Sequence, residues 1–503
     1  MQSDPFDIVA LVRKNSLYVL AGKLLNPVVT LVVTGFLVRQ LSMQEYGIYN
    51  TLIAVMGYVS LLSSLGLLNI YQRYIPEFNY QKDYASVRTL VWKGGGVRTL
   101  LAAACIVLIL VFSEQAGKLF KIEGYLNYFR LFAIGILFAL ECELLGLTLT
   151  SLFLHKYFVI AQIGYTWFRA GILYLALRHG ANLERLLWCE IICYGVLAGL
   201  QFLFYYRQFD RLHRKKSKNP FPWKRIRRYG SFSYFNEMGE QILDVSTDFL
   251  VISSFLGPVQ VAIYAFANQV MRLLSRWMPH MLIIDVITPT FFTRYAHKRS
   301  LSELSNMFQL FVKIIAFFFF PLCAGLFMLG DKFIIYFFDA KYLPSLQVLY
   351  AVAFFSMFNA FASPLGLLVQ SVEKVEIHFY SKVFSIYNLV GDILVVKPFG
   401  ILGVALVTGS AILFKNALTY LYIRKSVKVS LPLKGMLTMT VNSIIMGLFL
   451  FAVRGFIHNV VTFIGVAALS GLVYLAISSI HRSFQPFERE WFNRLMGKRW
   501  FVF

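Results

Sequence analysis

The feature that most constrains this chain is a succession of apolar stretches, each long enough to cross a lipid bilayer as a helix. A spanning helix needs about 20 mostly apolar residues, and the 503-residue sequence contains fourteen such stretches. Only 15% of the residues are charged, against roughly 25% in soluble proteins, which disfavours soluble multidomain, fibrous and disordered folds. The sequence therefore predicts an all-α membrane protein with about fourteen transmembrane helices. The predicted spans are residues 16–38, 48–71, 89–112, 126–150, 157–178, 185–206, 230–256, 260–291, 308–330, 345–370, 379–397, 401–423, 436–456 and 459–480.

The distribution of basic residues predicts the orientation of these helices. Lys and Arg total 48 against 25 Asp and Glu, a net charge of +23. The densest run, residues 207–228, contains ten basic residues and one Asp, and further basic loops occur at 294–299, 424–434 and 489–499. If the spans alternate, all four lie on one side, which the positive-inside rule makes cytoplasmic. Both termini are thus expected in the cytoplasm. The basic segments are expected to meet anionic lipid headgroups rather than nucleic acid.

A faint internal repeat predicts how the helices group. Residues 41–49 and 256–264 match at three of nine positions, at an offset of 215. Six predicted helices separate the copies, so both halves have the same orientation. The repeat predicts two six-helix bundles related by a pseudo-twofold axis along the membrane normal, plus two C-terminal helices. A binding site is expected between the bundles. The predicted domains are residues 1–206 (N-terminal lobe), 207–229 (basic cytoplasmic linker), 230–425 (C-terminal lobe) and 426–503 (two extra helices and a cytoplasmic tail).

Acidic residues inside predicted span 7 are the first candidates for function. A charge at the centre of a bilayer costs at least ~2.5 kcal/mol. Glu237, Glu240, Asp244 and Asp248 would share an arc of about 80° on one continuous helix. The first two also lie close enough to the arginines at the start of the span to pair with them. Asp244 and Asp248 lie deeper, and we predict that they bind a coupling H⁺ or Na⁺.

Basic residues inside predicted spans form a second candidate set. Arg272 and Arg276 are four residues apart in span 8, and they either pair with the span 7 acids or receive an anion. Arginine is suited to bidentate phosphate contacts. Lys23 in span 1 and Lys313 in span 9 are two further cations at membrane depth.

Spans 3 and 4 add charges whose roles the sequence leaves open. Lys93 and Arg98 flank a run of three glycines, which has no phosphate-binding pattern and instead favours close helix contact or a hinge. Glu141 and Glu143 are two residues apart and cannot share a helix face, so at least one is expected to pair with another helix.

The sequence offers no candidates for catalysis or metal binding. The five cysteines lie in apolar runs, and neither a CxxC nor an HExxH motif is present. No catalytic residue, metal site or cofactor is therefore predicted beyond the coupling ion. The first residues lack the pattern of a cleaved signal peptide, so the first span is expected to be retained.

Four short motifs resemble those of a known family. Residues 39–49, with Arg39, Glu45 and Gly47, resemble the turn after helix 1 of bacterial polysaccharide exporters. Residues 65–77 resemble the end of their helix 2, and residues 330–342 and 398–405 resemble the turns before helices 10 and 12. The residues of the helix 2 motif are Arg73, Pro76 and Glu77. The motifs occur in the expected order from about residue 12 to 425. The family is that of the O-antigen and lipid-linked oligosaccharide (Wzx-type) flippases, related to multidrug extrusion transporters and lipid II flippases.

The resemblance implies alternating access by two six-helix lobes in the bacterial inner membrane. A polyprenyl-diphosphate-linked oligosaccharide would move from the cytoplasmic to the outer leaflet, driven by an H⁺ or Na⁺ gradient. Lys23, Arg272, Arg276 and Lys313 would then contact the diphosphate. A polysaccharide polymerase and glycosyltransferases are the expected functional neighbours, and membrane lipids the surrounding partners.

Two alternatives remain open on the sequence. A multidrug cation antiporter of the same superfamily should have an acidic, aromatic cavity, as span 7 suggests, although buried Lys and Arg oppose it. A membrane enzyme such as a polymerase should have a sizeable external loop, whereas the longest connection here, 207–229, is predicted to be cytoplasmic.

Overall fold

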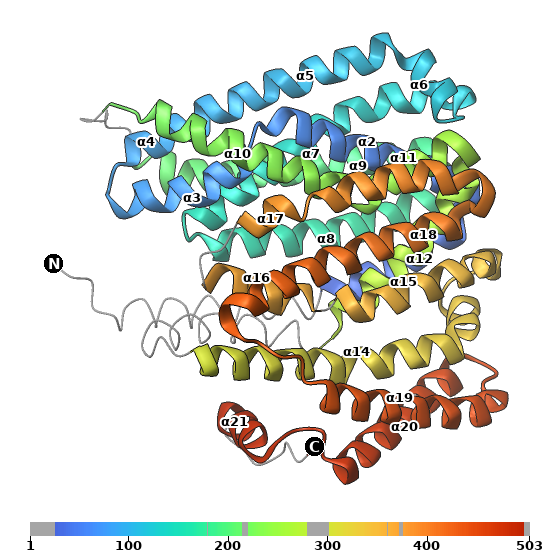
Figure 1. Ribbon diagram of the computed structural model, residues 1–503. Helices are drawn as coiled ribbons and strands as arrows, with labels where there is room; N and C mark the ends of the chain where they lie inside the picture. The colour runs from blue at the N-terminus through green and yellow to red at the C-terminus, as the bar shows by residue number, and fades with distance from the viewer. Residues whose placement is uncertain are drawn as a thin grey trace. The chain divides into compact units, whose positions relative to one another are not determined.

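A computed structural model of the protein describes residues 26–178, 180–213, 220–278, 301–359, 361–371, 376–496 and 503. All the regular elements within these residues are helices (Figure 1). Residues 26–40 are helical, and they are followed along the chain by the numbered elements. In the first half these are α2 (Met43–Ser64), α3 (Leu67–Tyr80), α4 (Tyr84–Thr89), η1 (Leu90–Gly94), α5 (Gly95–Val111), α6 (Ser113–Leu119), η2 (Glu123–Tyr125), α7 (Leu126–Ser151), α8 (His155–Leu177), α9 (Leu183–Tyr205), η3 (Tyr206–Asp210), α10 (Trp223–Ile242), α11 (Val245–Leu256) and α12 (Pro258–Arg276). In the second half they are α14 (Leu301–Phe337), η4 (Ala340–Ser345), α15 (Leu346–Asn359), α16 (Ala362–Ser371), α17 (Glu376–Tyr380), α18 (Val383–Val427), α19 (Leu433–Val453), η5 (Arg454–Phe456), α20 (Val460–His481) and α21 (Pro486–Met496).

Most helices of the described residues coincide in position with predicted spans, although some spans break or join. Among the described residues, nine helical segments are long and apolar enough to cross a membrane. Predicted spans 11 and 12 form the single element α18, which turns sharply at Gly400, where φ is +61°. Glycine tolerates this left-handed conformation because it has no Cβ. The chain is therefore an all-α, multi-pass membrane protein, as predicted.

Predicted span 7 is two helices rather than one, which corrects the assumption of a continuous acidic face. α10 ends at Ile242 and α11 begins at Val245, and Asp244 lies between them as the N-cap of α11. The Asp244 carboxylate accepts hydrogen bonds from the Ser246 N–H (2.9 Å) and the Ser246 hydroxyl (2.5 Å). Asp side chains compete with helical backbone bonding in this way, so the break occurs at the acid itself.

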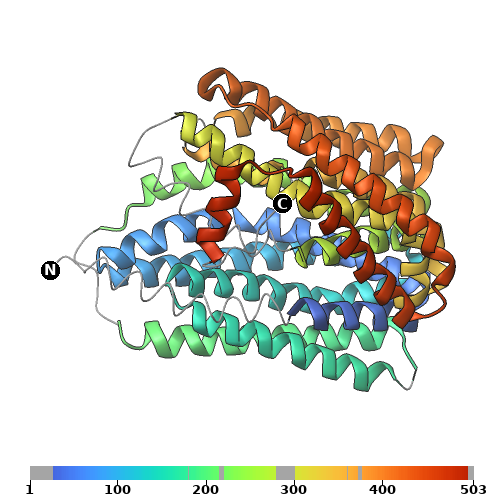
Figure 2. The ribbon, with the colours of Figure 1, turned by 90° about the horizontal axis from the view of Figure 1, so that it is seen from below.

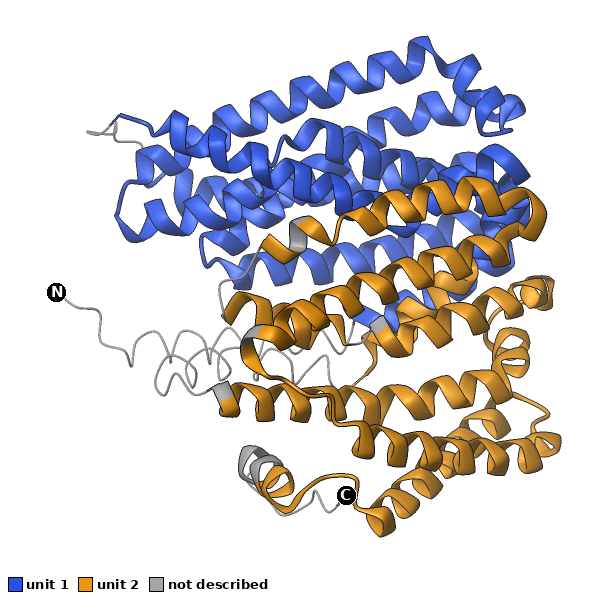
Figure 3. Ribbon diagram, in the orientation of Figure 1, with its two compact units in different colours: residues 1–265 blue, residues 266–503 orange. Residues whose placement is uncertain are grey.

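The chain separates into two compact units, residues 1–265 and 266–503 (Figure 3). In unit 1, α7 and α8 pack against α9, and α2 packs against α5 and α11. α10 and α11 belong to unit 1 because they pack on α2 and α3. The compact units thus divide later than the predicted boundary near residue 230. The predicted four-part division into lobes, linker and tail stays a prediction.

In unit 2, α14 packs against both α15 and α19, while α15 also packs against α18. The two last apolar helices, α19 and α20, contact each other and are joined by η5 (Figure 2). They correspond to predicted spans 13 and 14. The short helix α21 follows them and is amphipathic in sequence.

The two copies of the internal repeat contact each other within unit 1. Gly47 in the first copy lies against the backbone of Pro258 in the second, and a Cβ at Gly47 would overlap the Pro258 carbonyl. α2 can approach the start of α12 this closely only because residue 47 has no side chain. The glycine of the first family motif therefore has a packing role.

Candidate functional site

A cavity of about 450 Å³ lies among the helices of unit 1, and we call it the unit 1 cavity. Its walls come from α2, α3, α7, α9 and α10, with Asp244 at the end of α10. Four carboxylates line it, together with small, polar and apolar side chains. The lining residues are Met56, Gly57, Ser60, Leu61, Ser64, Leu68, Ala139, Leu140, Glu143, Tyr194, Glu237, Glu240, Gln241 and Asp244.

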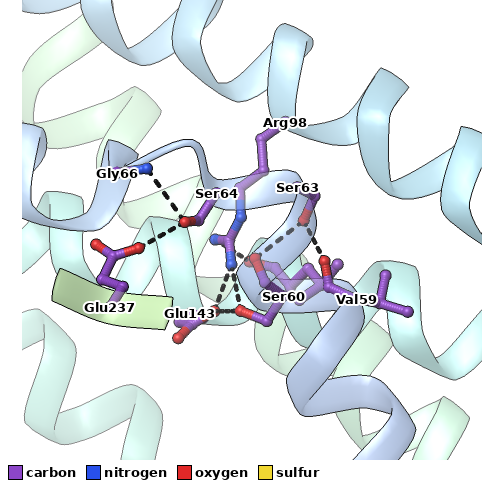
Figure 4. A network of polar contacts seen from close by, with 9 residues as sticks. Val59, Ser60, Ser63, Ser64, Gly66, Arg98, Glu143 and Glu237 are labelled. Atoms are coloured by element: carbon purple, nitrogen blue, oxygen red, sulfur yellow. Dashed lines mark hydrogen bonds and ion pairs between the residues drawn. The ribbon is translucent and has the colours of Figure 1, made fainter. Parts of the chain in front are cut away.

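One wall of the unit 1 cavity is an ion pair between Arg98 of α5 and Glu143 of α7 (Figure 4). The Arg98 Nη2 atom lies 2.5 Å from Glu143 Oε2 and 2.8 Å from Ser60 Oγ, and Nη1 donates to the Leu140 carbonyl at 3.1 Å. The Arg98 side chain is 2% exposed, whereas that of Glu143 is 44% exposed. The pair is therefore buried at its cationic end and open to the cavity at its acidic end.

Glu237 of α10 lies at a second wall and is held by neutral donors. The Ser64 hydroxyl donates to one of its oxygens at 2.6 Å, and the Asn69 amide donates to the other at 2.7 Å. Ser64 in turn accepts the Gly66 N–H at 3.2 Å, where the chain turns from α2 into α3 (Figure 4). The donors to Glu237 lie on helices distant in sequence. They differ from the alternative drawn from the sequence, in which Glu237 pairs with arginines at the start of its own span.

The two predicted ion-coupling residues occupy different environments. Asp244 is exposed and lines the unit 1 cavity. Asp248 is fully buried in α11 and accepts a hydrogen bond from the Tyr264 hydroxyl at 2.5 Å. Asp248 is not among the residues that line the cavity. The break between α10 and α11 separates the two acids, which a continuous helix would have placed on one face.

The three described residues of the predicted diphosphate set, Arg272, Arg276 and Lys313, are not among the lining residues of the unit 1 cavity. Arg272 and Arg276 are exposed on α12, and Arg272 donates to Gln269 at 2.9 Å. Lys313 of α14 is buried and forms an ion pair of 2.8 Å with Glu488 of α21. Lys23 lies outside the described residues. Their role in binding a diphosphate stays a prediction.

The first family motif positions backbone and helix ends. Glu45 forms a capping box with Ser42 at the start of α2, since each side chain bonds the other residue's backbone N–H. The second Glu45 oxygen accepts the Leu183 N–H at 3.0 Å, which ties α2 to the start of α9. Arg39 is exposed near the end of the preceding helix, residues 26–40.

The second family motif belongs to the end of α3. Pro76 lies inside this helix, and Glu77 forms a bidentate ion pair with Arg225 of α10 at 2.7 and 3.1 Å. The Arg73 guanidinium lies over the Tyr229 ring, 5.3 Å from its centroid. Both charged residues therefore connect α3 to the first turns of α10.

The unit 1 network confirms one expectation from the sequence and contains a further ion pair that the sequence did not predict. The expectation that Glu141 or Glu143 contacts another helix is confirmed for both, because Thr99 of α5 donates to Glu141 at 2.5 Å. A fully buried Glu190 of α9 also pairs with Arg169 of α8 at 2.5 Å and accepts the Tyr49 hydroxyl at 3.0 Å. The sequence shows these as isolated charges in apolar spans, without indicating which helices are neighbours.

The unit 1 cavity has the chemistry of a cation site. Four carboxylates line it, and Arg98 neutralises one of them, so its net charge is negative when the acids are ionised. Carboxylate oxygens in a low-dielectric surrounding attract H⁺ or a metal cation strongly. A diphosphate, in contrast, would be repelled here.

The amino-acid sequence matches the model of the polysaccharide biosynthesis protein family over residues 12–294. The chain belongs to this family. The match covers more than half of the chain and includes both of the repeat copies and all of the unit 1 cavity. The resemblance to polysaccharide exporters inferred from the motifs is thereby confirmed.

Individual similar proteins agree with the family. The teichuronic acid biosynthesis protein TuaB of Bacillus subtilis is 26% identical over 164 residues. That match spans 32% of this chain and only about a third (33%) of TuaB. It therefore links the proteins by a shared segment rather than by their full lengths.

Solved structures show the fold. The lipid II flippase MurJ in an inward closed conformation superposes with a TM-score of 0.69 at 18% identity, covering 96% of this chain and 99% of MurJ. An inward-facing MATE-family multidrug resistance transporter gives 0.67 at 13% identity, covering 82% of this chain and 98% of the transporter. This protein thus has the two-lobe fold of these transporters, which confirms the predicted fold class.

Proposed function

We propose that the protein is a flippase for polyprenyl-diphosphate-linked oligosaccharide, moving it from the cytoplasmic to the outer leaflet of the bacterial inner membrane by alternating access. The family match carries the proposal, because its description concerns polysaccharide biosynthesis. The unit 1 cavity supports the transport part of it, because it gathers ionisable groups among apolar helices. Charges at such depth are costly and are retained at transport sites. The names of TuaB and MurJ, one a teichuronic acid biosynthesis protein and the other a lipid II flippase, are consistent with a lipid-linked saccharide as the cargo.

We assign coupling to an H⁺ or Na⁺ gradient to the carboxylates of the unit 1 cavity. Asp244 keeps its predicted role, and Glu143 and Glu237 join it because they line the same space. Protonation or cation binding at Glu143 would weaken its attraction to Arg98, which links α7 to α5. The occupancy of the cavity would thereby change the contact between two helices, as a coupled transporter requires.

One observation favours a second candidate, a cation antiporter of the same superfamily. The acidity of the unit 1 cavity, with Tyr194 in its wall, suits a cationic drug as well as a coupling ion. The family match opposes this reading, because its description concerns polysaccharide biosynthesis.

Reconstituted proteoliposomes test the two functions side by side. The purified protein is given a fluorescent polyprenyl-diphosphate-linked saccharide in one preparation and a cationic dye in another, each with and without an imposed ion gradient. We expect flipping of the lipid, accelerated by the gradient, and no dye movement above that of empty liposomes. Dye transport without lipid flipping would establish the antiporter instead.

A further inference from the structure

A second pocket in unit 1, of about 780 Å³, lies between the end of α3 and the start of α10, and we call it the α3–α10 pocket. Cationic and aromatic side chains dominate its lining. The lining residues are Arg73, Tyr74, Phe221, Pro222, Trp223, Lys224, Arg225, Arg228, Tyr229 and Phe232. Neither an aspartate nor a glutamate is among these described lining residues.

Two arginines of the α3–α10 pocket, Arg73 and Arg225, are exposed and also lie against aromatic rings. The Arg73 guanidinium lies beside both Tyr74 and Tyr229, 5.9 and 5.3 Å from the ring centroids. Arg225 lies 5.1 Å from the Tyr74 ring and bonds Glu77, and this bond raises the pKa of Arg225 above its ordinary value. The Glu77 carboxylate thus balances one of the four lining cations, Arg225, and the pocket retains a net positive charge.

Exposed aromatic side chains beside basic residues indicate that the pocket lies at a membrane surface. Trp223 is 47% exposed and Phe232 is 72% exposed, beside basic residues of the segment predicted to be cytoplasmic. Trp, Arg and Lys gather where a bilayer meets water. The first turn of α10, which lines the pocket, also contributes the positive end of its helix dipole.

The same two helices connect this pocket to the unit 1 cavity. Leu68 of α3 and Glu237 of α10 line the cavity, whereas Arg73 and Arg228 of those helices line the pocket. On α3, Leu68 and Arg73 are five residues apart, or roughly 8 Å along the helix. On α10, Arg228 and Glu237 are nine residues apart, or roughly 14 Å. An anionic headgroup is attracted to the pocket and repelled by the acids of the cavity. The two sites therefore select opposite charges.

We propose that the α3–α10 pocket binds the diphosphate–sugar headgroup of the lipid-linked saccharide at the membrane surface before transport. This inference rests on the proposed function for its ligand. Arginines bind phosphate oxygens through paired N–H groups, and the exposed rings of Trp223 and Phe232 offer flat apolar faces to a sugar. Two phosphates match several cations better than the single phosphate of a common phospholipid does. The polyprenyl tail stays in the bilayer.

Equilibrium binding of a fluorescent polyprenyl-diphosphate sugar to the full-length protein, in nanodiscs of neutral phosphatidylcholine, tests this proposal. The double variant R73A/R228A removes two exposed cations from the lining, and we expect Kd to rise by about tenfold or more. R227A is the matched control, because Arg227 is exposed on the same helix and does not line the pocket. We expect R227A to change Kd by less than about twofold.

A variant with the opposite effect guards against general damage to the fold. Glu77→Gln removes the carboxylate beside the pocket and leaves Arg225 available to the ligand, so Kd should fall. Unchanged binding in R73A/R228A, or weaker binding in E77Q, would overturn the proposal.

Competitors identify the source of the phosphate chemistry. Free inorganic diphosphate should compete weakly, since it lacks the sugar and the tail, and phosphatidylglycerol should compete less than the diphosphate lipid at equal amounts. Equal competition by phosphatidylglycerol would overturn the assignment to the diphosphate lipid. Binding that depends on Arg73 and Arg228 in a protein that flips no lipid would refute the proposed function alone. Flipping with arginine-independent binding would refute this inference alone.

Discussion

Two ion pairs, one in each unit, bring together a cation and an acid from different helices, but they differ in how far they are closed. In unit 1, Arg98 is 2% exposed and its partner Glu143 is 44% exposed. In unit 2, Lys313 is 6% exposed and Glu488 is 2% exposed. The open pair faces a cavity with three further carboxylates, and the closed pair faces only protein.

This difference separates charges that can exchange with a cargo from charges that hold the fold. A carboxylate at a cavity can bind and release a cation without unfolding its surroundings. A pair buried at both ends is compensated only by its partner, so removing either group leaves a costly charge. We therefore assign transport to the open pair and attachment of α21 to the closed one.

The largest expected effect is on the closed pair. Glu488→Gln leaves the Lys313 ammonium buried in α14 without its carboxylate, and we expect the free energy of unfolding to fall by about 3–5 kcal/mol. The double variant K313M/E488L replaces both charges by apolar groups and should recover most of that loss. Thermal and denaturant unfolding in nanodiscs measure both.

The transport rate of the same double variant tests the earlier interpretation of Lys313. If Lys313 only attaches α21, the flipping rate per folded molecule stays within about twofold of the wild-type rate. A stable K313M/E488L protein that has lost flipping would instead support the predicted contact between Lys313 and the diphosphate. The closed pair would then serve transport as well as the fold.

A smaller loss of stability is expected at the open pair. Arg98→Met removes the buried cation but leaves Glu143 in contact with cavity water, so the remaining charge is partly solvated. We expect the free energy of unfolding to fall by about 1–3 kcal/mol, chiefly because Glu143 and Ser60 lose a charged hydrogen-bond donor. A loss equal to that of E488Q would mean that the two pairs do not differ in the way proposed.

Asp244 and Asp248 of predicted span 7 also differ in exposure, and we expect smaller effects on stability there. Asp248→Asn alters a buried bond to Tyr264, and we expect a loss of about 1–2 kcal/mol in unfolding free energy with flipping retained. Asp244→Asn at the cavity should retain stability and reduce gradient-driven flipping severalfold. Unfolding curves and flipping rates for both variants decide between this pattern and its reverse.

The smallest effect is expected at a surface pair in unit 2. Arg454 and Asp331 lie 2.8 Å apart with exposed fractions of 38% and 27%. Arg454→Ala should change the unfolding free energy by less than about 1 kcal/mol, because solvated pairs gain little. A loss near that of E488Q would show that distance rather than closure determines the stability of these pairs.

The sequence predicts the membrane fold well because its evidence is local. Apolar stretches of fixed length mark the spans, and α5, α7, α9 and α20 begin and end within six residues of the predictions. The break at Asp244 was missed because hydropathy alone does not show that a carboxylate caps a new helix start. The turn at Gly400, in contrast, lies between predicted spans 11 and 12 and within the motif at residues 398–405, so the sequence located it.

The candidate site was only partly predictable because it depends on contacts between distant helices. Asp244 was identified from its depth in the sequence, and the need of Glu143 for another helix followed from its spacing. The partner Arg98 lies 45 residues away, and no periodicity points to it. The pairing of Lys313 with Glu488, 175 residues apart, likewise appears only in the fold.

If Glu143, the open acid of unit 1, couples transport to a cation gradient, Glu143→Gln should remove that coupling. Glutamate 141, two residues away, bonds Thr99 and does not line the cavity, so E141Q is the matched control. The measurement is the flipping rate of a polyprenyl-diphosphate-linked saccharide in proteoliposomes, with and without an H⁺ or Na⁺ gradient. We expect the gradient to accelerate wild-type and E141Q protein alike and to leave E143Q at its rate without a gradient. Equal acceleration of E143Q and E141Q would contradict this expectation.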